Sequence, residues 1–215
     1  MIEIYRFEQV TSTNEVAKDL AKKNSDDFVV QADEQTAGKG RKNRSWESPP
    51  GGLYFSICTG QGPLLPLKGS IAVAEVLDEL GVSPKLKWPN DVLVEGKKVC
   101  GILVESLEKK AVVGIGLNVE SAPLIDSTCL SDLIEGTVQK EDLMKDIIRR
   151  FYGQDSVLEA YKRYCSTIGK RVKISTASGE IVGAAVDIDG RGRLVLEGGE
   201  KVLSGDVVHL RKDEN

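Results

Sequence analysis

Hydrophobic and polar positions change their spacing along the chain, and this spacing predicts a mixture of helices and strands. Apolar residues at helical spacing predict helices over residues 13–23, 67–80, 141–151 and 155–166. Apolar runs bounded by turn residues predict strands over residues 28–32, 53–58, 86–88, 92–94, 99–105 and 111–118. Short turns such as Glu95-Gly96 join the later strands as hairpins, so we expect a mixed, largely antiparallel sheet.

The pattern changes near residue 168, because only strands are predicted after it. Apolar and polar residues alternate over residues 172–174, 181–188, 193–196 and 207–210, with glycine-containing turns between them. These short strands predict a small β-barrel, which is too small to be stable alone and should pack on the rest of the chain. We therefore predict an α/β (α+β) domain over residues 1–167, followed by a β domain over residues 168–215.

The composition is that of an ordinary folded protein. The 215 residues are 40% hydrophobic and 29% charged, with a formal net charge of −4. No apolar run approaches the roughly 20 residues that a helix needs to cross a bilayer. The first residues also lack the order of a signal peptide. We therefore expect a cytoplasmic protein without a membrane partner.

The histidine and cysteine content argues against several common catalytic and metal sites. The single histidine, His209, lies in an alternating strand pattern, so we expect it to be structural. Ser-His-Asp triads, Cys-His pairs and histidine-rich metal sites are disfavoured, because each of them needs an imidazole beside a second group and the chain has only this one histidine. The four cysteines are tens of residues apart and form no C-x-x-C pair, so we expect reduced core thiols rather than a zinc site or disulfides.

The long polar loop over residues 38–46 is the strongest candidate for a ligand site. It carries four positive charges within six residues of an acidic protein, and its glycines let backbone N–H groups approach a ligand. Arginine side chains suit phosphate oxygens, so this combination predicts a bound anion. The loop matches neither a Walker A motif nor a dinucleotide fingerprint. A solvated basic loop is the alternative, and Trp46 favours the ligand site because an indole ring can stack on a base.

Three further segments hold polar residues whose roles the pattern leaves open. Ser12-Thr13-Asn14-Glu15 has the S-x-x-E order of a helix capping box. Asn90-Asp91 is either a simple turn or part of a site. Strand alternation puts Lys98 on the same face as the buried-type Cys100. Lys98 is therefore either a lysine that snorkels to the surface or a fixed charge for a carboxylate or phosphate.

Taken together, five segments resemble biotin protein ligases in identity and order. They are Ser12-Thr13-Asn14, the loop over 38–46, Lys87-Trp88-Pro89-Asn90-Asp91, the strand segment 98–103 and Gly114-Ile115-Gly116-Leu117-Asn118. The resemblance extends over nearly the whole chain, including the C-terminal β segment. It implies a catalytic domain like those of class II aminoacyl-tRNA synthetases, shared with lipoate ligases, followed by an SH3-like β-barrel.

The resemblance also implies an ATP-dependent ligase. Members of the family join biotin to ATP as biotinyl-5′-AMP, and then transfer the biotinyl group to a lysine of a biotin carboxyl carrier protein. Biotin and ATP would be the substrates, with Mg²⁺ accompanying ATP. The carrier protein would be the macromolecular partner, and a homodimer through a sheet edge stays open.

Site residues follow from the resemblance, position by position. Those implied to bind biotin are Ser12, Thr13, Asn14, Gln35, Lys39, Gly40, Arg41, Lys98 and Gly101. Those implied to bind ATP or the adenylate are Lys39, Gly40, Arg41, Arg44, Trp46, Lys98 and Asn118. Lys98 would bridge the biotin carboxylate and the α-phosphate, and Arg41 and Asp91 complete the implied catalytic set. Asp91 would either bind Mg²⁺ or orient the acceptor lysine, and the resemblance does not choose between these roles.

The chain departs from the commonest family pattern at three positions. Lys39 and Asn43 stand where arginine and glycine are frequent, and Cys100 stands where alanine or glycine is usual. Lys39 keeps the charge but loses the fork of the guanidinium group, which weakens the case for its phosphate contact. Cys100 is small enough to fit beside a ligand.

Several alternatives remain at this point. The Ser-Thr-Asn motif starts at residue 12, which leaves no room before it for a helix-turn-helix domain, so we expect a monofunctional enzyme. A lipoate or octanoate ligase of the same fold is the nearest rival, and the basic loop and C-terminal segment favour biotin. A non-enzymatic biotin-binding sensor would not need Lys98 or Arg41 as catalysts. A nucleic-acid module is disfavoured because the remainder of the chain is acidic, so we expect no DNA partner.

Overall fold

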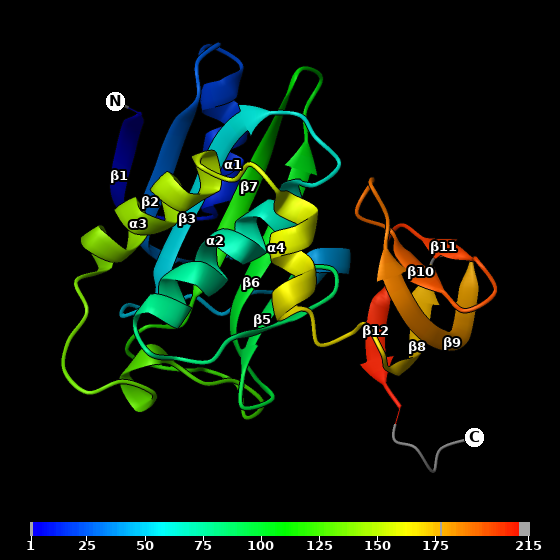
Figure 1. The fold of residues 1–215 in the computed structure, drawn as a ribbon. Coiled ribbons are helices and arrows are strands. Elements are labelled where there is room, and N and C mark those ends of the chain that lie inside the picture. The colour runs from blue at the N-terminus through cyan, green and yellow to red at the C-terminus, as the bar shows by residue number, and fades with distance from the viewer. Residues whose placement is uncertain (1, 177, 211–215) are drawn as a thin grey trace.

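The computed structural model of the chain describes residues 2–176 and 178–210. Within these residues, the larger sheet has seven strands in the order β1-β2-β3-β7-β6-β5-β4 (Figure 1). Their bounds are β1 Glu3–Val10, β2 Phe28–Gln35, β3 Leu53–Gly60, β4 Lys85–Lys87, β5 Asp91–Val94, β6 Lys97–Ser106 and β7 Lys110–Leu117. β1 and β2 run parallel and the other neighbours run antiparallel, which confirms the mixed, largely antiparallel sheet.

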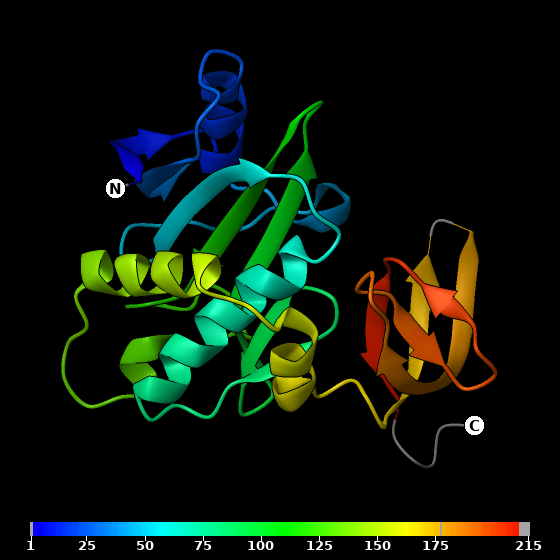
Figure 2. The ribbon, with the colours of Figure 1, turned by 45° about the horizontal axis from the view of Figure 1, so that its top comes forward.

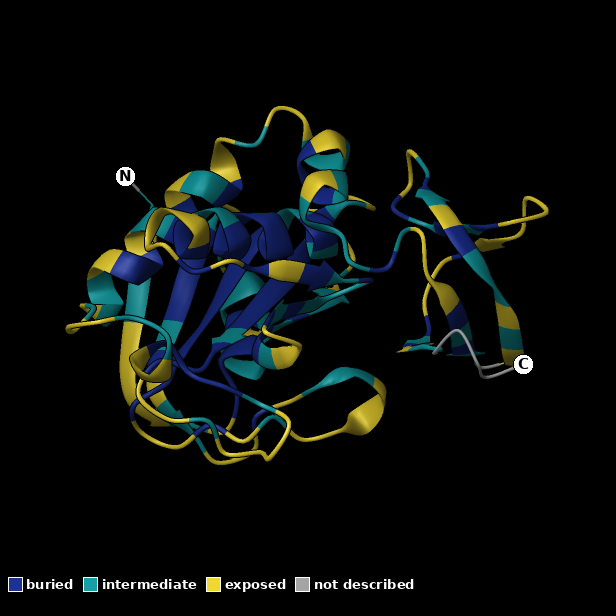
Figure 3. Ribbon diagram, turned by 60° about the horizontal axis from the view of Figure 1, so that its bottom comes forward, coloured by how far each residue is buried: buried dark blue, intermediate teal, exposed yellow. Residues whose placement is uncertain are grey.

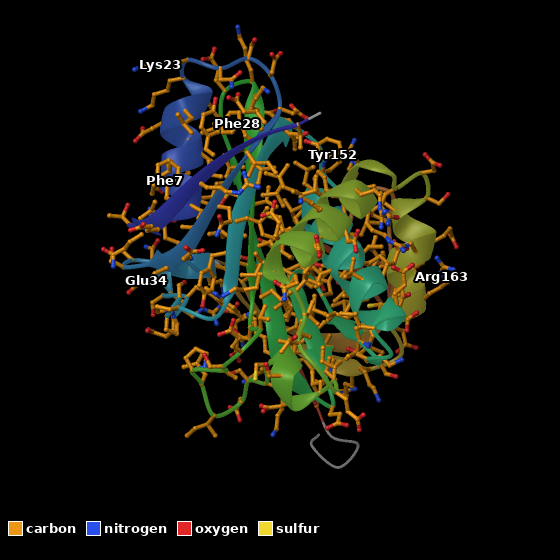
Figure 4. All side chains as sticks on the ribbon, turned by 90° about the vertical axis from the view of Figure 1, so that its left-hand side faces the viewer. Phe7, Lys23, Phe28, Glu34, Tyr152 and Arg163 are labelled. Atoms are coloured by element: carbon orange, nitrogen blue, oxygen red, sulfur yellow. The ribbon has the colours of Figure 1, made fainter. Side chains whose placement is uncertain are left out.

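Strand β1 lies at the edge of this sheet, where the sequence pattern predicts no strand. Most of its residues are exposed, so they carry no clear apolar face. Phe7 of β1 stays 37% exposed, whereas Phe28 of the neighbouring β2 is fully buried (Figure 4). Backbone pairing with β2 holds the strand in place, and such pairing leaves no mark in the side-chain pattern.

Helices cover both faces of the larger sheet. They are α1 Thr13–Ala21, α2 Leu65–Glu79, α3 Lys140–Tyr152 and α4 Val157–Tyr164. Helix α2 packs against both α3 and α4 on one face, and α1 lies on the other (Figures 1 and 2). Alternate residues of β2 supply the two cores, since Val29 belongs to the main core and Val30 to the smaller one beside α1. These helices confirm the predicted ones, with ends shifted by a few residues. None of the described helices is both long and apolar enough to cross a membrane.

The C-terminal residues form a second, antiparallel sheet in the order β11-β10-β9-β8-β12. Its strands are β8 Arg171–Thr176, β9 Gly179–Ile188, β10 Leu194–Leu196, β11 Lys201–Val202 and β12 Asp206–His209. Every second residue is buried in β8 (Val172, Ile174) and β10 (Leu194, Leu196), as the pattern predicts, whereas β9 does not alternate strictly (Figure 3). Among the described residues the strand order is open, with β11 and β12 at its edges. The antiparallel strands are therefore confirmed, and this hydrogen-bond pattern does not close them into a barrel.

Trp88 joins the second sheet to the first. Its side chain is 1% exposed, and its indole N–H donates to the carbonyl of Gly192 at 2.9 Å. Its backbone N–H donates to the hydroxyl of Thr167 at 3.1 Å. That hydroxyl also lies 3.1 Å from Nε2 of His209, and burial lowers the pKa of this imidazole. His209 therefore takes part in packing, which fits the structural role expected of it.

Candidate active site

A cavity of about 270 Å³ lies between the larger sheet, the basic loop and an edge of the second sheet. The residues that the resemblance assigns to biotin all line it: Ser12, Thr13, Asn14, Gln35, Lys39, Gly40, Arg41, Lys98 and Gly101. Arg44, Trp46 and Asp91 line it as well. The fold thus gathers side chains from widely separated segments around one space, and their roles toward a ligand stay predictions.

At one end of this cavity, buried polar side chains hold one another in fixed orientations. The carbonyl oxygen of Gln35 accepts hydrogen bonds from the backbone N–H and the hydroxyl of Thr13, at 2.9 and 3.1 Å. Ser56 lies within hydrogen-bond distance of the Thr13 hydroxyl and donates to Oδ1 of Asn14 at 2.6 Å. The amide nitrogen of Asn14 donates to Glu105 at 2.7 Å. Thr13, Asn14 and Ser56 are at most 4% exposed, so the orientation of these groups is set before any ligand binds.

Ser12 does not cap helix α1 through its side chain, so the capping-box prediction is wrong. The residue stands at the N-cap in extended conformation, but its hydroxyl makes no capping hydrogen bond. Glu15 pairs with Lys18 at 2.7 Å and with Lys39 at 2.5 Å instead of reaching back to the helix end. Hydrogen bonds from these two lysines lower the pKa of Glu15 to about 2. Two charged donors therefore replace the backbone N–H that a capping box would use, and the buried Ser12 hydroxyl lies on the cavity wall.

Glycines of β6 and β7 let side chains lie directly on the sheet. A Cβ atom at Gly116 would stand 2.4 Å from the indole nitrogen of Trp46. A Cβ atom at Gly114 would stand 2.3 Å from Oδ1 of Asn14. Both distances are too short for real atoms, so these glycines are required by close approach. The indole nitrogen of Trp46 is buried against Gly116 and has no hydrogen-bond partner among the described residues.

A bulge in β6 brings Lys98 to the cavity. The residue pairs across β5 and β6 skip Val99, because Cys100 and Lys98 face consecutive residues of β5. Cys100 is a fully buried free thiol in the main core, and burial raises its pKa, whereas Lys98 lines the cavity. The prediction that these two residues share a face is therefore wrong, since strict alternation ends at the bulge. Cys100 faces the core rather than a ligand.

Lys98 is held by a carboxylate and an aromatic ring. Its Nζ lies 2.6 Å from Oδ1 of Asp91 and 5.1 Å from the centre of the Trp46 ring. The side chains of Lys98 and Asp91 are 32% and 26% exposed, so both are partly shielded from solvent where they line the cavity. The structure thus places two of the three predicted catalytic residues, Lys98 and Asp91, in direct contact.

The basic loop is folded on itself and rests on the second sheet. Its ends meet where the Trp46 N–H donates to the carbonyl of Gly38 at 2.9 Å. Asn43 has a φ of 60°, which explains why a glycine suits this position and why asparagine is a tolerable substitute. The half-buried Arg41 donates to Oδ1 of Asn90 at 2.9 Å and to the carbonyl of Gly205 at 3.1 Å. Burial lowers the pKa of Arg41, and nearby carboxylates oppose that effect.

A second cavity of about 280 Å³ adjoins the first. The side chains common to both linings are Ser45, Trp46, Lys87, Asp91, Lys98 and Leu124. Asn118, which the resemblance assigns to the adenylate, lines only the second cavity among these two. It is 2% exposed, and its amide nitrogen donates to the carbonyl of Thr128 at 3.1 Å. The Lys98–Asp91 pair therefore stands between the two cavities and lines both of them.

Sequence reasoning misses several residues that build this site. Ser56 sits inside an apolar strand, so its pattern is that of core, and Glu105 reads as the end of another strand. Gly205 accepts a hydrogen bond from Arg41, and Asp206 contacts Arg44 at 2.5 Å. The sequence gives a weak indication for Glu105, because strand alternation puts this charged residue on the same face of β6 as Gly101. In the structure its carboxylate contacts Asn14 and Lys18 of α1. The sequence gives no indication for Asp206, because this residue lies in the second sheet, far along the chain from the loop that it contacts.

Comparison with known proteins gives a consistent result. A sequence model described as the biotin/lipoate A/B protein ligase family matches residues 6–120, and one described as the biotin protein ligase C terminal domain matches residues 167–210. The chain is 34% identical to the biotin--[acetyl-CoA-carboxylase] ligase of Mycobacterium tuberculosis, over 94% of this chain and 87% of that protein. It is 31% identical to the bifunctional ligase/repressor BirA of Bacillus subtilis, over 92% of this chain and 71% of that protein. A structure of the biotin protein ligase from Aquifex aeolicus in complex with biotin and ATP superimposes with a TM-score of 0.83 at 29% identity, and the match covers 99% of this chain and 100% of that one.

Proposed function

This chain belongs to the biotin/lipoate A/B protein ligase family, and we propose that its two adjoining cavities hold the two substrates of a biotin protein ligase. The enzyme activates biotin with ATP to biotinyl-5′-AMP and then transfers the biotinyl group to a lysine of an acceptor protein. The names of its relatives point to acetyl-CoA carboxylase, so the acceptor is a biotin carboxyl carrier protein.

The position of Lys98 carries this proposal. Activation requires the carboxylate of biotin to attack the α-phosphorus of ATP, while pyrophosphate leaves. Two anions must approach each other in this step, so a fixed positive charge between them lowers the barrier. Lys98 stands at the junction of the cavities and is paired with Asp91. We infer that Lys98 exchanges this carboxylate for the two substrate anions.

The polar end of the first cavity suits the ureido ring of biotin. A buried heterocycle with N–H and C=O groups needs partners of both kinds, because unpaired polar groups are costly to bury. Ser12, Thr13, Asn14 and Gln35 supply hydroxyl and amide groups there, and Gly101 leaves room along the strand. Their mutual hydrogen bonds support this assignment, since they fix the direction of each donor and acceptor in advance.

The loop and the second cavity suit ATP. Arg41 and Arg44 offer forked donors for phosphate oxygens, and Lys39 and the backbone of Gly40 lie beside them. Trp46 lines both cavities and is assigned to the adenine ring. Asn118 is assigned to the edge of that ring from the far side of the second cavity.

The junction also suits a magnesium ion that arrives with ATP. Mg²⁺ in proteins usually keeps several waters and binds through one or two carboxylates together with substrate phosphates. The described residues contain no group of three His, Cys, Asp or Glu side chains placed to hold a metal by themselves. Asp91 offers one carboxylate on both cavity linings, so it is the residue that would hold the ion. The ion would supply further neutralisation of phosphate charge.

Asp91→Asn distinguishes the two roles proposed for this carboxylate. If Asp91 holds Mg²⁺, the variant forms biotinyl-5′-AMP slowly and needs more Mg²⁺ to do so. If Asp91 orients the acceptor lysine, adenylate forms at the normal rate and only the transfer to the carrier is slow. Measuring the two half-reactions separately, with the exposed Asp19→Asn as control, decides between them.

The cell compartment, the domain division and the oligomeric state complete the proposal. We place the enzyme in the cytoplasm, with a catalytic domain over residues 1–167 and a C-terminal domain over residues 168–215. The contacts of Trp88 and Arg41 across this division support a fixed arrangement of the two parts. The exposed edge of β1 is the place where a homodimer would form.

The direct test of the function is transfer of labelled biotin to a carrier domain. We expect transfer that requires ATP and that excess lipoate does not inhibit. Transfer of lipoate instead of biotin would identify a lipoate ligase. Tight biotin binding without any transfer would contradict an enzymatic role and leave a biotin sensor.

A further inference from the structure

The second sheet contributes a carboxylate to the basic loop. Asp206, the first residue of β12, lies 2.5 Å from Nη2 of Arg44 through one oxygen and 3.2 Å from Nζ of Lys42 through the other. Asp206 also lines the first cavity. Arg44, which is assigned to phosphate and lines this cavity, is thus paired with an anion of the chain itself, and so is the neighbouring Lys42, which lines neither cavity.

The loop also has contacts that do not involve this carboxylate. Arg41 donates to Asn90 and to the carbonyl of Gly205, and Lys42 also donates to the carbonyl of Ser175 at 2.9 Å. The Gly40 N–H donates to the carbonyl of Arg44 at 2.7 Å within the loop. These contacts use neutral acceptors, so they survive the loss of the negative charge at residue 206.

Asp206 is ionised at neutral pH. Burial would raise its pKa, but hydrogen bonds from Lys42 and Arg44 outweigh that effect and hold the pKa below its usual value. The side chains of Asp206, Lys42 and Arg44 are 37%, 43% and 61% exposed, and ion pairs at such positions are weak. A ligand with several negative charges can therefore displace this carboxylate.

We propose that Asp206 occupies the place of a ligand phosphate in the free enzyme and is displaced from Arg44 when nucleotide binds. This inference rests on the proposed function, because it takes the phosphates of ATP as the ligand of the loop. Asp206 then weakens nucleotide binding in two ways. It occupies Arg44, and it repels the incoming phosphates. The C-terminal sheet thereby sets the ATP concentration at which the enzyme works.

Asp206→Asn tests the inference in the intact enzyme, because it removes the charge and keeps the size. We expect the KM for ATP to fall roughly fivefold, with kcat and the KM for biotin nearly unchanged. The difference from wild type should shrink in high salt, since the interaction is electrostatic and partly exposed. Asp187→Asn is the matched control, because Asp187 belongs to the same second sheet but pairs with Lys162 at 2.7 Å, and neither residue lines either cavity. An unchanged or higher KM for ATP in Asp206→Asn would overturn the inference and make Asp206 a brace of the loop.

Calorimetry with tripolyphosphate, without biotin and without metal, separates this inference from the proposed function. Tripolyphosphate should bind Asp206→Asn several-fold more tightly than wild type or Asp187→Asn. Equal or weaker binding would contradict the inference even in an active ligase. A chain that fails to transfer biotin but shows the tighter binding would contradict the proposed function alone.

Discussion

The two ends of the first cavity are built by different physical means. At the end of Thr13, Asn14 and Ser56, buried side chains are fixed by short hydrogen bonds, and almost no water reaches them. At the end of the basic loop, half-exposed cations are held by ion pairs with Asp206 and Glu15. The buried end recognises one shape and tolerates no change, because its unpaired groups would be costly. The charged end can exchange its partners, because exposed ion pairs are worth little and are screened by salt.

The largest effect on this comparison should come from Gly114→Ala, at the buried end. The added Cβ would stand 2.3 Å from Oδ1 of Asn14, which is tied to neighbours on both sides and cannot yield. We expect the KM for biotin to rise by at least about tenfold, independent of salt. Gly60→Ala is the control, since a Cβ there meets nothing within 4 Å. An unchanged KM for biotin in Gly114→Ala would show that the buried end is more pliable than we conclude.

Ser56→Ala should have the next largest effect. The hydroxyl of Ser56 is 0% exposed and serves both Thr13 and Asn14, so its loss leaves buried polar groups unpaired. We expect a loss of about 1–3 kcal/mol in the free energy of unfolding, measured by urea denaturation, together with weaker biotin binding. The exposed Ser25→Ala should change stability by less than about 0.5 kcal/mol. A loss of unfolding free energy no larger than that of the control would contradict the claim that the buried end of the cavity is more rigidly built than the charged end.

Arg44→Gln tests the charged end. The substitution removes a cation and its pairing with Asp206, so the KM for ATP should rise about three- to tenfold at low salt. The KM for biotin should not change, and the effect on ATP should diminish as salt increases. Arg149→Gln, at an exposed pair with Asp146, serves as control. A salt-independent loss, or a loss of biotin affinity, would mean that the loop is as rigidly built as the buried end.

The smallest effect should be the pH dependence that Glu15 contributes to stability. Its pKa is about 2 in the folded chain, below the usual value of 4.5 for glutamate, so the carboxylate stabilises the fold at pH values above about 4.5. That contribution is lost as the pH falls from about 4.5 toward 2, because over this range the unfolded state binds the proton and the folded state does not. The difference in unfolding free energy between wild type and Glu15→Gln should therefore shrink over this range, and shrink further in salt. A difference that grows as the pH falls would contradict the ion pairs seen with Lys18 and Lys39.

The same contrast explains what the sequence predicts well. The basic loop, Lys98 and Asp91 are visible in the sequence because charged and glycine-rich segments interrupt apolar strands. The helices and most strands are predicted because each buries a continuous face. Strand β1 is not predicted, since its edge position leaves its side chains exposed and only backbone bonds hold it.

Other features depend on contacts that no local pattern records. The bulge at Val99 decides that Lys98, and not Cys100, faces the cavity, and it shows only in the pairing with β5. Ser12 matches a capping box by spacing, but Glu15 is taken by two lysines, one of which is far along the chain. Asp206 belongs to the second sheet and contacts a loop that is distant in sequence, so only the tertiary structure can bring it into the site.

The most direct test of the account is single-turnover formation of biotinyl-5′-AMP by Lys98→Ala. Removal of a fixed charge from between two reacting anions should slow this step by about 10²–10³-fold, while biotin and ATP still bind. Lys97→Ala is the matched control, because Lys97 is the exposed neighbour on the same strand and lines neither cavity; it should react like wild type. Formation of the adenylate by Lys98→Ala at the rate of Lys97→Ala would contradict the central claim that Lys98 joins the two substrates at the junction of the cavities.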